Sequence, residues 1–206
     1  MIPILAAAVL AAGASGPVRV PAPPAPPVPR AEFHDAMRKL WEDHVTWTRL
    51  YIVSAAAGIA DADQTAQRLL KNQADIGDAI VPYYGAAAGT GLTALLRSHI
   101  LTAAKIIAAA KSGDTSVVRS ASQAWYANAD SIADFLSTAN PQQWPAATLR
   151  DGMRMHLDLT LKEATARLHG DWANDIAAYD AIHLHILQLA DLLSNGIMRQ
   201  FPGRFH

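Results

Sequence analysis

The chain has 206 residues, of which 51% are hydrophobic and 17% charged, and it contains no cysteine. Its formal net charge of -1, without any long basic run, argues against nucleic acid or anionic membrane surfaces as partners. Without thiols the protein forms no disulfide and holds no iron–sulfur cluster, so any metal ligands must be nitrogen or oxygen atoms.

The first thirty residues differ in composition from the rest of the chain. An uncharged apolar run, MIPILAAAVLAAGASG, precedes the proline-rich spacer PVRVPAPPAPPVPR at 17–30, and residues 12–14 match an A-x-A cleavage site. These features predict export to the periplasm or the extracellular space, although the usual basic n-region is missing. The alternative is a disordered Ala/Pro tail on a cytoplasmic protein. In both cases residues 1–30 are expected to be disordered and dispensable for folding, and the mature domain is not expected to insert into a membrane.

From Ala31 onward, apolar residues recur at helical spacing, and no segment alternates as a strand would. Glycine, aspartate and proline signals divide this region into helices. The expected breaks are Gly58, the glycine-rich segment 82–91, Gly113-Asp114, the NPQQWP segment 140–145 and Gly170-Asp171, and the last helix ends near Gly196, before Pro202. The sequence therefore predicts an all-α, six-helix bundle over residues 31–206.

The same pattern occurs three times in this region. A histidine lies fourteen residues before each of the three hairpin glycines, and these histidines are His44, His99 and His156. The segments NQADIGDAI (72–80) and NADSIADFL (128–136) also align, which superposes Asn72 on Asn128. Because self-similarity at a fixed period indicates tandem units, we predict three αα-hairpin repeats at about 31–88, 89–144 and 145–202.

The second helix of the third repeat can be aligned in two ways. Matching Asp191 to Asp78 and Asp134 places His185 over the two asparagines, whereas the apolar stripe of the helix places His183 there. The stripe reflects packing, and for that reason His183 is expected to face the interior.

The repeated positions predict a group of polar side chains inside the bundle. The candidate metal ligands are His44, His99, His156 and His183, and the candidate ligand-binding residues are Asn72, Asn128, Glu163 and Asp180. Glu163 follows His156 by two helical turns, so the two share a helix face. Asp180 precedes His183 by three residues and does the same. Helical bundles build metal sites from such inward-facing groups, and imidazoles with carboxylates favour zinc or copper.

Three functional interpretations follow from this group. The leading one is an exported, non-enzymatic protein that binds a small ligand or a divalent metal ion through its interior His/Glu/Asn cluster. The second is an enzyme that uses His156 and Glu163 for acid–base chemistry. The third is a purely structural or partner-binding bundle whose histidines are hydrogen-bonded core residues. Convergence of the histidines, as opposed to layering along the bundle, would separate these interpretations.

Three stretches resemble a family of small, uncharacterised, exported bacterial helical-bundle proteins; they are RKLWEDHVTWTRLYIVSAAAG, RLLKNQADIGDAIVPYYG and GDWANDIAAYDAIHLHILQLADLLSNGI. The resemblance covers about residues 32–202 and implies the all-helical fold. Some members carry the automatic names glycosyltransferase or acetylglutamate kinase, and both activities imply an α/β nucleotide-binding sheet that this sequence does not predict. The resemblance therefore implies a fold and carries over no catalytic residue.

Overall fold

The computed structural model describes residues 26–206. Its helices are α1 (Arg30–Ala57), α2 (Ala62–Tyr84), α3 (Ala86–Ser112), α4 (Thr115–Ala139), α5 (Ala146–Leu168), α6 (Trp172–Gln200) and the short 3-10 helix η1 (Pro202–Arg204). No β-strand occurs among the described residues, which confirms the expected all-α fold with six α-helices. The predicted signal-like segment and most of the proline-rich spacer lie outside the described residues.

Left-handed glycines and aspartate caps form the hairpin turns that the sequence indicates. Gly58, Gly113 and Gly170 have φ angles of 69°, 77° and 73°, a conformation that is costly for any residue with a Cβ. Asp114 and Asp171 each cap the next helix by accepting a hydrogen bond from the backbone N–H three residues later. Glycine therefore ends α1, α3 and α5 in the same way, and an aspartate cap follows directly at two of the three turns.

The glycine-rich segment 82–91, expected to be a turn, is mostly helical. α2 continues through Pro82 to Tyr84, Gly85 leaves helical geometry, and α3 begins with the next residue. Close packing of α2 against α3 explains the small residues, because a Cβ added to Gly77 would lie 2.6 Å from the carbonyl oxygen of Gly89. These two glycines therefore serve a helix–helix contact.

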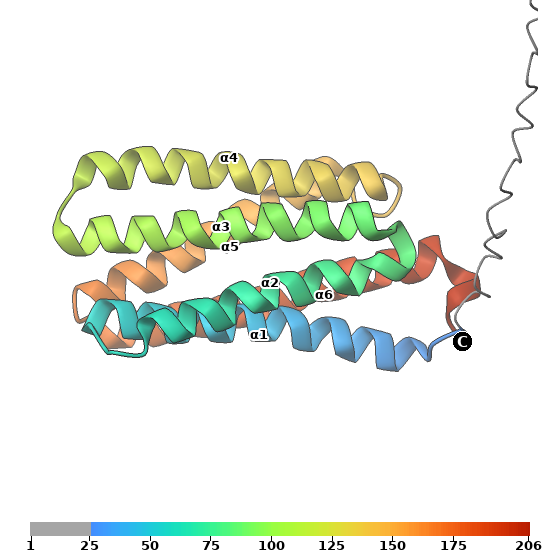
Figure 1. The fold of residues 1–206 in the computed structure, drawn as a ribbon, viewed down its shortest axis with the longest axis horizontal. Coiled ribbons are helices and arrows are strands. Elements are labelled where there is room, and N and C mark those ends of the chain that lie inside the picture. The colour runs from blue at the N-terminus through green and yellow to red at the C-terminus, as the bar shows by residue number, and fades with distance from the viewer. Residues whose placement is uncertain (1–25) are drawn as a thin grey trace, which may run out of the picture.

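The six helices form a closed ring, in which each helix packs against its neighbours along the chain and α6 packs back against α1. The helices run along the long axis of the domain (Figure 1). The turns that follow α1, α3 and α5 lie at one end, and the described chain begins and ends at the other (Figure 1). α1 also contacts α3 and α5 across the interior, so residues from these three helices can meet at the centre.

The residues just before α1 pack against the C-terminal segment. Val28 N donates a hydrogen bond to Arg204 O (3.0 Å), and His206 N donates one to Val28 O (3.2 Å), which makes a short parallel bridge. Phe33 and Phe205 pack nearby with ring centres 5.0 Å apart. The ordered domain therefore begins before Ala31 and includes Val28.

α3 is long and apolar enough to cross a membrane, by length and composition only, and no other described helix is. It packs between α2 and α4 and contributes Leu92, Leu96 and Ile100 to the buried core. A core helix has the same composition, and that is the position α3 occupies in this fold.

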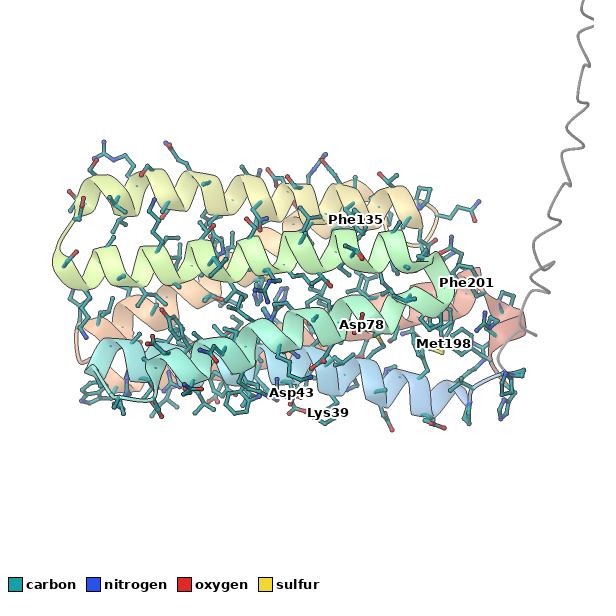
Figure 2. All side chains as sticks on the ribbon, in the orientation of Figure 1. Lys39, Asp43, Asp78, Phe135, Met198 and Phe201 are labelled. Carbon is teal, nitrogen blue, oxygen red and sulfur yellow. The ribbon has the colours of Figure 1, made fainter. Side chains whose placement is uncertain are left out.

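Several ion pairs lie on the outer faces of the ring. Lys39 and Asp43 of α1 (Figure 2) pair at 2.7 Å, one helical turn apart, and Asp43 also lies 3.6 Å from Arg68 of α2. Arg38 of the same helix pairs with Asp191 of α6 at 2.6 Å, across the junction that closes the ring. Exposed pairs of this kind contribute little to stability, so closure of the ring depends on buried contacts, which are the apolar core and the ion pair between Arg49 of α1 and Asp175 of α6.

Candidate functional site

Three histidines from three different helices meet inside the ring. His44 on α1, His99 on α3 and His156 on α5 are each at most 4% exposed. The ring centres of His44 and His156 lie 5.4 Å apart, and those of His99 and His156 lie 6.1 Å apart. We refer to these three residues as the histidine cluster. They converge on one part of the interior and are not layered along the bundle.

The cluster is enclosed by aromatic and apolar side chains. The Trp41 ring lies 5.9 Å from His44, and the Trp125 ring lies 5.0 Å from His99, measured between ring centres. Burial lowers the pKa of His44 to about 4 and the pKa of His99 to about 3. The pKa of His156 is also lowered well below its ordinary value, first by burial and then by the neighbouring imidazoles. All three rings are therefore uncharged at neutral pH.

A polar side chain on the following helix binds the backbone beside each histidine of the cluster. The three hydrogen bonds run from Asn72 Nδ2 to Leu40 O (2.9 Å), from Asn128 Nδ2 to Leu95 O (3.1 Å) and from His185 Nε2 to Gly152 O (2.9 Å). Each accepting carbonyl lies four residues, about one helical turn, before a cluster histidine. Asn128 Oδ1 also accepts a hydrogen bond from His99 Nδ1 (3.0 Å). The two expected asparagines therefore lie at the cluster, where they hold the helices that carry it.

His183 lies outside the cluster. Its Nε2 donates to Glu42 Oε1 at 2.9 Å, and its side chain is 33% exposed. His185 has the inner position instead, with its ring centre 6.3 Å from that of His156. Asp180, three residues before His183, is exposed and also lies away from the cluster.

The expectation that His183 faces the interior is therefore wrong, and the packing of α6 explains why. This helix is covered by α5 on one side and by α1 on the other, so its apolar surface is too wide to fix a single inward direction. Two residues of the stripe on which the expectation rested, Trp172 and Ile176, are each 56% exposed. The alternative alignment through Asp191 gives the correct register.

Glu163 belongs to a second buried polar site, near the end of α5. Arg49 Nη1 donates to Glu163 Oε1 (3.0 Å), and Arg49 also forms a two-point ion pair with Asp175 of α6. Both carboxylate side chains are 1% exposed. Burial raises the pKa of Glu163 to about 7, and Arg49 opposes that effect. Glu163 therefore pairs with Arg49 rather than with His156, which removes the basis for the expected acid–base pair.

Several buried polar atoms around the cluster lack a hydrogen-bond partner in the described part of the chain. They include Nδ1 of His156 and Nε1 of Trp41 and of Trp125. His44 lies beside Gln73, and a hydrogen bond from that side chain opposes the lowering of the His44 pKa. The great majority of buried polar atoms in native proteins are paired, which makes the three unpartnered atoms notable.

The imidazole nitrogens of the cluster are not arranged as a complete metal site. Within residues 26–206, no three His, Cys, Asp or Glu side chains are arranged so that they could hold a metal ion. His99 donates through Nδ1, which leaves Nε2 as its lone-pair nitrogen. Each of the three neutral rings thus carries one nitrogen with a lone pair.

Comparison with protein-family models, with curated proteins and with solved structures gave no match. The function is therefore argued from the geometry of the site.

The sequence analysis overlooked Arg49, Asp175 and Gln73. The partners of Arg49 lie 114 and 126 residues away along the chain, and no local spacing signals such a contact. Gln73 follows the repeated Asn72 directly, and its Nε2 donates to Asn72 Oδ1 (3.0 Å). The polar residue Gln73 beside the repeated Asn72 could have indicated that Gln73 also lies near the cluster.

Proposed function

We propose that this protein is a non-enzymatic metal-binding protein, whose histidine cluster takes up one zinc or copper ion between neutral imidazoles. The observation that carries the proposal is the close approach of two buried imidazoles, His44 and His156, whose ring centres lie 5.4 Å apart and of which His156 has an Nδ1 without a partner. Two imidazoles that share one ion, at metal–nitrogen distances of about 2.0–2.1 Å, have ring centres roughly 5–5.5 Å apart.

The protonation state of the cluster supports the same proposal. Metal ions bind neutral imidazole, and the lowered pKa values of these rings keep them neutral at and below pH 7. Histidines that bind metal commonly donate their other ring N–H to a fixed acceptor, as His99 Nδ1 does to Asn128. His99 would therefore need no change of tautomer to act as a ligand through Nε2.

A water molecule is a weaker candidate for the guest. The Nδ1 atoms of His44 and His156 present almost no surface that water can reach. A buried water needs a void of at least one water sphere and two to four polar partners. A metal ion is smaller than water and bonds at shorter distance, so it fits between these rings after rotation of the imidazoles about χ2, a torsion with a broad energy minimum.

We further infer that the chain consists of three tandem αα-hairpins, each of which contributes one imidazole. Three features repeat with the expected period and support this inference: the left-handed glycines, the histidines of the cluster, and the hydrogen bonds to the carbonyl one turn before each histidine. Closure of three like hairpins into a ring accounts for the meeting of one side chain from each.

We also propose that the protein is exported and shares the fold of the bacterial helical-bundle family that three of its segments resemble. The support is sequence-based: the apolar run, the A-x-A pattern and the spacer within residues 1–30. The metal proposal does not depend on it.

Calorimetric titration of the chelator-treated protein with zinc(II), and with copper(I) under reducing conditions, tests the metal proposal. We expect one ion per chain, with release of few protons because the ligands are already neutral. His156→Leu should abolish binding, and the matched control His183→Gln should keep it, since His183 lies outside the cluster. If neither ion binds, or if both variants bind as the wild type does, the cluster is a structural network only.

A further inference from the structure

We propose that a cavity between α3, α4 and α5, partly open to solvent, binds small, uncharged, apolar molecules. Its volume is about 90 Å³. The side chains around it include Ile106 and Ile107 of α3, Trp125 of α4, and Ala164 and Leu168 of α5. The cavity is separate from the histidine cluster, and the inference does not depend on metal binding.

Few polar groups line the cavity. None of the residues around it is charged, and the polar side-chain groups are the hydroxyls of Thr160 and Thr165 and the indole N–H of Trp125. Thr160 Oγ1 already donates to His156 O at 2.8 Å. Water forms few hydrogen bonds against such a lining, so an apolar guest can displace it at little cost. The lining thus favours an apolar guest and disfavours ions and zwitterions.

The size of the cavity limits the guest further. An engineered apolar cavity of about 150 Å³ in another protein stays dry and binds benzene or xenon. The present cavity is smaller, so its guests are of the class of xenon, diatomic gases and the smallest hydrocarbons. Such guests gain dispersion contacts with a wall that otherwise has no partner atoms.

The cavity wall is shared with residues that contact the histidine cluster. Trp125 lines the cavity and packs against His99, with ring centres 5.0 Å apart. Thr160 lines the cavity and binds the carbonyl oxygen of His156. A guest in the cavity therefore lies one side chain away from two imidazoles, and its arrival should change their NMR resonances.

Xenon-129 NMR of the full chain under increasing xenon pressure tests the proposal. The wild type should show a saturable xenon shift, together with a saturable change in the His99 imidazole resonances. Ala164→Leu fills the cavity and should remove both. Ala108→Leu adds the same side chain at an exposed position of α3 and should leave both unchanged.

Leu168→Ala provides a test that does not rely on a filled core. This substitution enlarges the cavity, so the variant should take up xenon more strongly than the wild type and should also bind benzene. A wild type without a saturable shift, an Ala164→Leu variant that binds as the wild type does, or a Leu168→Ala variant without increased uptake would each overturn the proposal.

Discussion

His99 and His156 offer a matched pair of substitutions with opposite expected effects in the metal-free protein. His99 Nδ1 donates to Asn128 Oδ1, so His99→Leu leaves that oxygen without its donor. A stranded buried acceptor costs about 1–3 kcal/mol. Asn128 is half-buried and can partly turn toward water, so we expect His99→Leu to lower the free energy of unfolding by about 1–2 kcal/mol, the lower part of that range.

His156→Leu should change the free energy of unfolding in the opposite direction. His156 is 4% exposed, and its Nδ1 has no partner, so the native protein already bears the desolvation of that atom. Leucine has a similar volume and removes this buried polar atom without stranding another ring partner. We therefore expect His156→Leu to be equal to the wild type or more stable by about 1 kcal/mol when metal is absent.

The measurement is urea unfolding at 25 °C and pH 7.5, first with chelator and then with zinc at a hundredfold excess over its Kd. Zinc should stabilise the wild type by about 2.7 kcal/mol. Both leucine variants should lose that gain, which would reverse the order of wild type and His156→Leu. If His156→Leu without metal is destabilised as much as His99→Leu, then His156 Nδ1 has a partner and the reasoning for the metal site fails.

Three further predictions concern pH, the N-terminal boundary and helix packing. Below pH 6.5 the unfolded chain takes up protons on His44, His99 and His156 that the native cluster does not bind, so the free energy of unfolding should decrease as the pH is lowered. Glu163, whose native pKa is raised to about 7, takes up its proton more readily in the folded state and has the opposite effect. The net slope should be roughly 2–3 kcal/mol per pH unit between pH 5 and 6, measurable by urea unfolding across that range, and a flat profile would mean that the rings are protonated in the folded state. A chain that starts at residue 31 should unfold several degrees below one that starts at residue 26, because it lacks the backbone hydrogen bonds of Val28; equal thermal midpoints would show that this bridge does not stabilise the domain. Gly77→Ala should cost about 1–3 kcal/mol in chemical unfolding, since its Cβ would lie 2.6 Å from a backbone oxygen of α3, and an unchanged midpoint would contradict that close approach.

Much of the fold could be predicted from the sequence because its signals are local. The glycines and aspartates that end and cap helices act through their own backbone and their immediate neighbours, so Gly58 and Gly113 marked helix ends correctly. The segment after Pro82 was misjudged because glycine has two uses. It permits a left-handed turn at Gly85, and it permits close helix packing at Gly89.

The candidate site could be predicted only where a pattern recurs in the sequence. His44, His99 and His156 were found because each lies fourteen residues before a glycine that marks a helix end. The fourth imidazole was missed because α6 is covered on two sides, and its apolar stripe does not define one inward direction. The Arg49–Glu163–Asp175 network was missed because it breaks the repeat and joins residues that are far apart in the chain.

Because α6 closes the ring against α1, the surface of α1 is completed by a helix that is synthesised after the other five of the ring. The face of α1 that α6 covers stays open while the first two hairpins emerge from the ribosome. His156 arrives only with the third hairpin, so the interior cluster cannot assemble on a partly made chain. A ribosome-bound intermediate therefore presents an open apolar edge of the kind that chaperones bind, and it loses that edge in a single step when the ring closes.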